Sequence, residues 1–406
     1  MLDIFVLLVV YVLSVVLISE FVRPRAGGQG VNFCLLLYHY HVLLGFYYGW
    51  FAWGTDTHFY WNLGDRYRYF YFESWLDSYG THNYAVFFIN YPLSRIMGLD
   101  FWTGTFIYAS VSAWAFVLLY LAGRNLFKNN KISVGGASIW PGILLLPSLH
   151  FWSSGIGKDS LVFLFIAIYF YGIRDLRKYL YLVIFSVIGL YHVRPHMAFI
   201  VLLSAAFMLF IDGKLHFSYK LVFFVLAAVG FGSIYDEVLD FLKLDELTTE
   251  DVEDLFNTSA TNLSYGRSYV DMSGYPYPLK LFTFWYRPLF FDAHNLSSFI
   301  NSIENAIALF LTIFIFSKVN PIQGYRKSPN GIKIMLLAFL LASIAFAGAL
   351  SNFGIIVRMK NMTFVYFLFF LVYIYDGHVW KEKVNKYRRM QIAQKRREAI
   401  KARTVQ

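Results

Sequence analysis

Cationic residues stand at four turns between apolar stretches of this chain. In the segment GLYHVRPHMAF (189–199), an arginine, a proline and two histidines separate two runs that are almost wholly apolar. The same arrangement recurs in GIGKD (155–159), FWYRPLFF (284–291) and SNFGIIVRMKN (351–361). Arginine binds phosphate through two parallel N–H groups, and lysine binds it as a compact point charge. With the four turns on one side of a membrane, we expect a lipid-borne diphosphate there, bound by Lys158, Arg194, Arg287 and Arg358.

A purely structural interpretation exists for each of these charges. Lysine and arginine at the end of a membrane span commonly extend their charged ends to the interface. Lys158 and Asp159 can pair with each other or with a neighbour, and Asp56 can cap a helix after Thr55. Histidines on apolar stretches favour hydrogen bonds between helices over ligand binding. The histidines in question are His39, His41, His150 and His192.

Composition indicates the elements that position these residues. The chain has 406 residues, of which 58% are hydrophobic and only 15% charged, whereas about 25% of residues are charged in soluble domains. Uncharged stretches such as 31–54 and 101–123 have the length of a helix that crosses the hydrocarbon core. We therefore predict an all-α polytopic membrane protein. The lone Cys34 excludes a disulfide within the chain and a cysteine-based metal site, and no metal or cofactor is expected.

Hydropathy predicts about eleven transmembrane helices within a single domain, residues 1–376. Some of the predicted spans are short, which allows tilted or re-entrant pieces between 138 and 212. The predicted spans are 3–22, 32–53, 101–123, 138–154, 159–173, 179–193, 197–212, 220–236, 297–317, 331–350 and 361–376.

Lysine and arginine gather in alternate connections, and this bias predicts an N-terminus outside and a C-terminus in the cytoplasm. The basic tail, 377–406, is expected to form a helix on the anionic inner leaflet. We expect no nucleic acid as a partner. Two long extracytoplasmic loops, 54–100 and 237–296, are rich in aromatic residues, which predicts interfacial helices at headgroup depth.

Five short motifs resemble a group of bacterial membrane proteins. The motifs are DTHFY (56–60), FWSSGIGKD (151–159), RPHMA (194–198), FWYRPLFF (284–291) and SIENA (302–306). Together with the long outer loops, they are similar to exopolysaccharide and O-antigen repeat-unit polymerases and to multi-span glycosyltransferases of the GT-C class. The resemblance covers most of the chain in topology and some 30 residues in motif.

This resemblance implies an enzyme of the bacterial inner (plasma) membrane that makes cell-surface polysaccharide. Its donor would be a sugar or oligosaccharide linked to polyprenyl diphosphate, with no nucleotide sugar and no metal. Lys158, Arg194, Arg287 and Arg358 would then stabilise the diphosphate as it leaves the anomeric carbon. Asp56, Asp65 and His196, in that order, are the candidates for accepting the proton of the attacking hydroxyl. Other polysaccharide-assembly proteins would be its partners.

Three other classes of function remain open at the level of sequence. A transporter or flippase for lipid-linked glycans, or for another amphipathic anion, needs the same cationic mouth and a polar path across the bilayer. An acyltransferase of envelope lipids needs an embedded His–Asp pair, for which His150 and Asp159 are the available residues. A haem or quinone protein needs histidines on facing helices, and His39 and His41 point to different sides of one helix.

Overall fold

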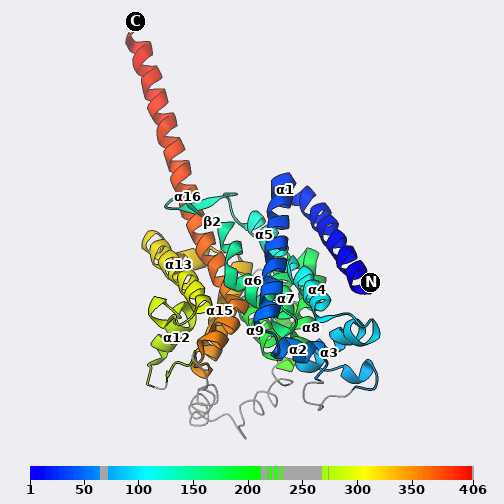
Figure 1. The fold of residues 1–406 in the computed structure, drawn as a ribbon. Helices are drawn as coiled ribbons and strands as arrows, with labels where there is room; N and C mark the ends of the chain where they lie inside the picture. The colour runs from blue at the N-terminus through cyan, green and yellow to red at the C-terminus, as the bar shows by residue number, and fades with distance from the viewer. Residues whose placement is uncertain are drawn as a thin grey trace.

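The protein is an all-α bundle of apolar helices (Figure 1). The structure, a computed structural model, describes residues 1–64, 72–211, 268–272 and 274–404, together with scattered positions between 217 and 232. In this part of the chain, six helices are long and apolar enough to cross a membrane, and a bent pair of helices makes a seventh candidate. The length and apolar character of these helices therefore indicate a membrane protein.

The N-terminal half carries the following elements in chain order: α1 (Leu2–Phe51), α2 (Asp56–Trp61), η2 (Leu76–Ser78), α3 (Asn83–Tyr91), η3 (Pro92–Ile96), α4 (Phe101–Ser112), α5 (Trp114–Leu126), β1 (Ile132–Val134), β2 (Ala137–Trp140), η4 (Gly142–Leu145), α6 (Pro147–Ser153), α7 (Lys158–Ile173), α8 (Leu176–Val193) and α9 (Pro195–Ile211). The two strands pair as an antiparallel hairpin.

The C-terminal half carries α12 (Tyr277–Tyr286), η5 (Phe290–Asp292), α13 (Leu296–Lys318), α14 (Pro321–Lys327), α15 (Asn330–Ala349) and α16 (Phe353–Thr404). Asn295 begins α13 by accepting a hydrogen bond from the Ser298 amide, as expected of an N-cap residue. The predicted tail helix is present as the continuation of α16, which extends away from the bundle to the C-terminus (Figure 1). The loop 237–296 is described only from residue 268, and most of the predicted span 220–236 lies outside the described residues.

Helix α1 consists of two arms that fold back on each other (Figure 1). Gly27 separates the arms with a φ of 66°, a conformation that favours glycine because it has no Cβ. The Tyr11 hydroxyl lies 3.2 Å from Nε2 of His39 and links the two arms. The arms correspond to the predicted spans 3–22 and 32–53.

The predicted span 138–154 is wrong as a single helix. This apolar segment forms strand β2, the 3-10 turn η4 and the short helix α6 instead. Pro141 and Pro147 explain the difference, because proline lacks the N–H that a continuous helix requires. Helix α6 then meets α7 at an angle of 116°. Gly157 lies at this bend with a φ of 143°, so the GIGKD turn depends on glycine.

Helices α7 and α16 form the centre of the bundle. Helix α7 packs against α5, α8 and α16, and α16 packs against α13 and α15. Their shared face is aromatic, and the Phe170 and Phe369 rings meet edge to face at 5.0 Å. The Tyr366 hydroxyl of α16 donates to the Ile166 carbonyl of α7 at 3.0 Å. These contacts hold the first turn of α7 at a fixed level beside the first turns of α16.

Close helix packing predicts a large effect of a small substitution at Gly123. A Cβ added there would lie 2.2 Å from the fully buried Trp140 ring, so Gly123→Ala requires helix α5 or the indole to move. We expect a loss of about 1–3 kcal/mol in unfolding free energy, measured by denaturation of the purified protein in detergent micelles. Gly28→Ala is the control, since nothing lies within 4 Å of its added Cβ. Equal stability of the two variants would contradict this packing.

Candidate functional site

The carboxylate of Asp159 brings together three of the predicted turns. It binds the Arg194 guanidinium, with 2.5 Å between Nη2 and Oδ1, and it also binds Nε of Arg358 through Oδ2. A second guanidinium nitrogen of Arg358 lies 3.5 Å from Oδ2 of Asp56. These residues belong to the first turn of α7, the α8–α9 junction, the early turns of α16 and the start of α2. We call this group, with Lys158, the Asp159 cluster.

Burial changes sharply across the Asp159 cluster. The side chains of Asp159 and Arg194 are each 9% exposed, whereas that of Asp56 is 65% exposed. Arg358 lies between these extremes and contacts both carboxylates. The cluster therefore leads from a buried ion pair to a carboxylate on the surface.

Arg194 retains donors that the protein does not satisfy. One terminal nitrogen, Nη1, is directed at Met359 Sδ at 2.9 Å, and a thioether is a weak acceptor. The buried Nε of Arg194 has no hydrogen-bond partner among the described residues. Asp159 thus uses part of the donor capacity of this guanidinium. The remaining N–H groups suit an additional oxygen-rich anion.

Lys158 is held within the cluster by residues of the segment 54–100. Its Nζ donates to Oδ1 of Asn83 at 2.9 Å, and the Tyr60 hydroxyl donates to the same oxygen at 3.2 Å. Burial raises the pKa of Tyr60 above its ordinary value, and the carboxylates of Asp56 and Asp159 raise it further. Tyr60 is therefore neutral at pH 7 and remains a hydrogen-bond donor. The cluster contains three cations and two carboxylates, which leaves one excess positive charge.

Arg287 is not brought into the Asp159 cluster. Its guanidinium forms a bidentate pair with Asp292, at 3.0 Å from Nε and 2.6 Å from Nη2. The hydrogen bond to Asp292 raises the pKa of Arg287 above its ordinary value, in spite of partial burial. The guanidinium also lies 5.1 Å from the centre of the Phe353 ring, at the start of α16. Its charge is already paired, and it braces the loop after α12.

The three predicted proton acceptors differ in burial, in their partners and in whether they lie in the described part of the chain. Asp56 lies in the cluster and is exposed. His196 stands two residues after Arg194 with its Nε2 enclosed, and that atom has no hydrogen-bond partner among the described residues. Asp65 lies outside the described residues. Asp56 is therefore the candidate with both a charged partner and access to solvent.

A second buried polar group lies deeper along α16. Lys360 is 2% exposed and donates to Oδ1 of Asn305 at 2.6 Å and to the Trp285 carbonyl at 3.2 Å. Glu304, 8% exposed, accepts a hydrogen bond from the Ser148 amide at 2.8 Å. A cavity of about 10 Å³ lies among these residues, roughly the space for one water molecule. Lys360 and Glu304 belong to the segments SNFGIIVRMKN and SIENA, but neither was among the residues predicted to bind the diphosphate or to accept the proton.

The prediction that histidines on the apolar stretches form hydrogen bonds between helices is confirmed for His41 and His150 and, between the two arms of α1, for His39, whereas the partner of His192 lies in a loop. His41 and His150 meet at 3.0 Å between their Nδ1 atoms, and His41 also lies 2.8 Å from the Ser112 hydroxyl. His39 pairs with Tyr11, as described above, and His192 pairs with the Tyr79 hydroxyl at 3.0 Å. His150 also lies 2.7 Å from the Leu144 carbonyl, so both ring nitrogens of His41 and of His150 have partners. His150 is thereby committed to His41 and not to Asp159.

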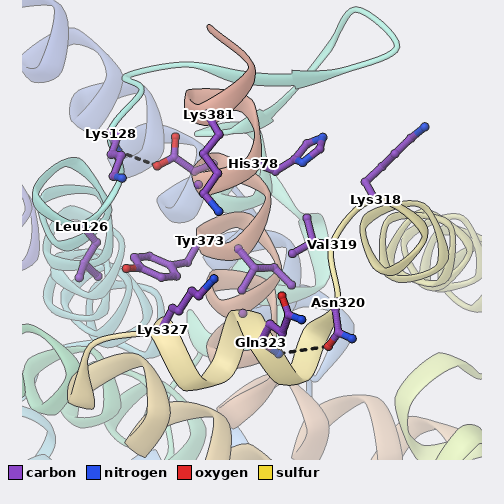
Figure 2. A pocket seen from close by; sticks show the side chains of 14 residues that line it. Leu126, Lys128, Lys318, Val319, Asn320, Gln323, Lys327, Tyr373, His378 and Lys381 are labelled. Atoms are coloured by element: carbon purple, nitrogen blue, oxygen red, sulfur yellow. Dashed lines mark hydrogen bonds between the residues drawn. The ribbon is translucent and has the colours of Figure 1, made fainter. Parts of the chain in front are cut away.

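A cavity of about 330 Å³ opens elsewhere, against the middle of α16 (Figure 2). Lysines and a histidine line it, together with polar and apolar residues of α14 and α16. No residue of the Asp159 cluster belongs to its lining. It is a separate feature of the molecule.

Asn83, Met359 and Asp292 are the neighbours of the cationic residues that sequence reasoning missed. Asn83 and Met359 contact Lys158 and Arg194, which lie far away in the chain, so only tertiary packing brings these pairs together. Asp292 stands five residues after Arg287, and this short spacing was a signal that could have identified the pair. Comparison with models of protein families, with curated proteins and with solved structures gave no match.

Removal of the Asp159 carboxylate should destabilise the protein. Asp159→Asn leaves two guanidinium groups without their shared partner, and breaking a buried pair costs about 3–5 kcal/mol. The unfolding free energy in micelles measures this loss. Glu73→Gln, on an exposed side chain, is the matched control. The triple replacement Asp159→Leu, Arg194→Met and Arg358→Met should recover most of the stability, and a triple variant as unstable as Asp159→Asn would contradict the ion-pair explanation.

Proposed function

We propose that the Asp159 cluster binds the diphosphate of a polyprenyl-linked glycan and supports transfer or polymerisation of its sugar outside the cytoplasm. The observation that carries this proposal is the unsatisfied donor capacity of the buried Arg194, beside Lys158 and Arg358. Two guanidinium groups and one ammonium group are better suited to bind a diphosphate than to bind a carboxylate. The resemblance of the GIGKD and RPHMA segments to polysaccharide polymerases and GT-C glycosyltransferases supports the same substrate class.

In the proposed reaction, the oxygen of an acceptor hydroxyl attacks the anomeric carbon of the lipid-linked sugar. The bond from this carbon to the diphosphate oxygen breaks, and the leaving diphosphate keeps the electron pair. Arg194, Arg358 and Lys158 stabilise the charge that accumulates on it, in surroundings from which water is largely excluded. Asp159 is a positioning residue, because it fixes the two guanidinium groups before the lipid binds.

Asp56 is the proposed acceptor of the hydroxyl proton. It is the exposed carboxylate of the cluster, and its contact with Arg358 places it beside the diphosphate-binding groups. A general base must lie within hydrogen-bond reach of the proton that it removes. Asp65 and His196 follow Asp56 in order of preference, and the enclosed Nε2 of His196 has no hydrogen-bond partner in the described part of the chain.

This function requires the cluster to face the extracytoplasmic side. The proposed arrangement has about eleven spans in the inner membrane of a bacterium, with the N-terminus outside and the basic tail in the cytoplasm. The contact of the Asp3 carboxylate with the Asp100 amide, at 2.9 Å, supports an N-terminus on the same side as the loop that ends at residue 100.

Single cysteines test the orientation in a Cys34→Ala background. Leu76→Cys and Phe291→Cys replace side chains that are 74% and 77% exposed, in the two proposed outer loops. An impermeant thiol reagent should label both in cells with a permeabilised outer envelope. Lys386→Cys, in the tail, should be labelled only after the inner membrane is opened. Labelling of Lys386→Cys before the inner membrane is opened, with Leu76→Cys and Phe291→Cys labelled only afterwards, would reverse the orientation.

Loss of transfer in an Arg194 variant is the direct test of function. The purified full-length protein, in liposomes, is given polyprenyl-diphosphate-linked glycan extracted from the source cells, and product length is read on a gel. We expect Arg194→Ala to lower the rate by about 10²-fold or more, since it removes donors to the leaving group. Arg194→Lys should retain part of the rate.

The control for this assay is Arg25→Ala, which removes an exposed arginine at the bend of α1. It should leave the rate unchanged. Normal product formation by Arg194→Ala at a normal protein level would rule out the diphosphate-binding role. Absence of any product with the unaltered protein would rule out the transfer reaction itself.

A flippase for lipid-linked glycans is the second candidate. The observation in its favour is the buried Lys360–Asn305 pair, which continues a polar route along α16 beyond Arg358. Charged residues inside a membrane domain commonly mark the path of a substrate or an ion. Movement of labelled lipid across the liposome bilayer without lengthening of the glycan would favour this candidate over transfer.

A further inference from the structure

The cavity against the middle of α16 has the composition of an anion-binding site. It lies among the C-terminal ends of α5 and α13, the short helix α14, and α16 around Asp376 (Figure 2). Its volume is about 330 Å³. Four lysines from four segments contribute to its lining, and they are Lys128, Lys318, Lys327 and Lys381. His378 adds a further nitrogen-bearing side chain, whose Nε2 lies 3.3 Å from Oε1 of Glu382, a residue outside the lining.

The lysines hold their charges without partners. None of the four ammonium groups makes an ion pair or a hydrogen bond within the described part of the chain. In Figure 2, Lys327 and Lys381 extend toward each other from opposite sides of the cavity, whereas Lys318 points outward at its rim. Like charges that converge without a counterion repel each other, and an anion between them relieves this repulsion.

The carboxylate in the lining does not supply that anion. Asp376 accepts hydrogen bonds from the amides of Lys128 and Asn129, at 2.7 and 3.1 Å, and from the Asn129 side chain at 2.7 Å. Its oxygens are therefore directed at the segment after α5. Four lysines against this one carboxylate leave an excess of three positive charges in the lining.

The remaining lining residues indicate which anion fits. Leu126, Val319 and Ile374 form an apolar part of the lining, and Gln323 supplies a side-chain amide. The cavity also adjoins the end of α13, a helix long enough to span a membrane. A ligand with a phosphate group and an apolar portion matches both parts of this lining. The headgroup of an anionic phospholipid has this chemistry, and a soluble phosphate shares its charged part.

We propose that this cavity binds a phosphate-bearing anion, with the phosphate between Lys327 and Lys381. Lys381 lies roughly 35 Å along α16 from Arg358, at the helical rise of 1.5 Å per residue, so the site is separate from the Asp159 cluster. Under the proposed orientation it faces the cytoplasm, where the inner leaflet carries anionic lipid. The proposal concerns a second site and is independent of the transfer reaction.

Direct binding to the full-length protein in micelles tests the proposal. The probes are short-chain phosphatidylglycerol, short-chain phosphatidylcholine and inorganic phosphate, each titrated at pH 7 and low salt. We expect phosphatidylglycerol to bind and phosphatidylcholine to bind far more weakly. Lys327→Gln and Lys381→Gln should each weaken the binding of phosphatidylglycerol about 5-fold. Gln323→Glu, which adds a carboxylate to the lining without shortening a side chain, should weaken it as well.

The matched control removes the same charge elsewhere on α16. Lys386→Gln with Lys395→Gln alters two exposed lysines that do not line the cavity, and the affinity should stay within about 2-fold of the original. If the cavity variants weaken the binding of inorganic phosphate as much as that of phosphatidylglycerol, the result would support a soluble phosphate compound as the ligand. The proposal would be overturned if the double variant Lys327→Gln/Lys381→Gln and the control bind phosphatidylglycerol equally well, while circular dichroism shows that both are folded.

Discussion

A buried carboxylate that serves two arginines is the interaction on which the arrangement of this protein depends. Asp159 lies in the first turn of α7, Arg194 lies between α8 and α9, and Arg358 lies in α16. Charges removed from water are stable only when they are paired and hydrogen-bonded. The three helical segments must therefore meet at one level for any of these groups to be buried. The sharp bend at Gly157 brings the first turn of α7 to that level.

This ion-pair arrangement also determines what the site can bind. Two guanidinium groups close together inside a protein would repel each other, and the carboxylate of Asp159 makes their proximity stable. It does so without satisfying Arg194, whose Nη1 faces a thioether and whose Nε has no partner in the described residues. The same carboxylate thus holds the cations in place and leaves donors for a ligand. A site of this kind is preorganised, because the cost of gathering the charges is met during folding.

Helix α16 connects the polar features of the molecule. Arg358 and Lys360 stand near its start, and Asp376 anchors the segment after α5. Lys381 lines the cavity against the middle of α16. Between these positions the helix is buried and aromatic, and it packs against α7 through Tyr366 and Phe369. A rigid, closely packed helix fixes the spacing of the groups that it carries. The two proposed sites are therefore held at a constant separation.

Several particular residues show how far reasoning from sequence reaches. His41 and His150 were correctly predicted to join helices, because a buried imidazole on an apolar helix requires a polar neighbour, whereas His192 pairs with Tyr79 of a loop. Arg287 was grouped with the other cations, yet it pairs with Asp292, which stands only a few residues later in the chain. The segment 138–154 has the hydropathy of a span but contains Pro141 and Pro147, and a hydropathy average does not register the effect of proline on a helix.

The sequence by itself determined that this is a helical membrane protein, because long uncharged stretches have no stable alternative in a bilayer. It also identified the cationic turns, because isolated charges beside apolar runs are costly and require a partner. Only the tertiary structure decided which partner each charge has. The contacts of Asp159 with Arg194 and Arg358, and of Lys158 with Asn83, join residues far apart in the chain. Such contacts depend on how the helices are rotated and shifted against one another, and side-chain packing sets those quantities.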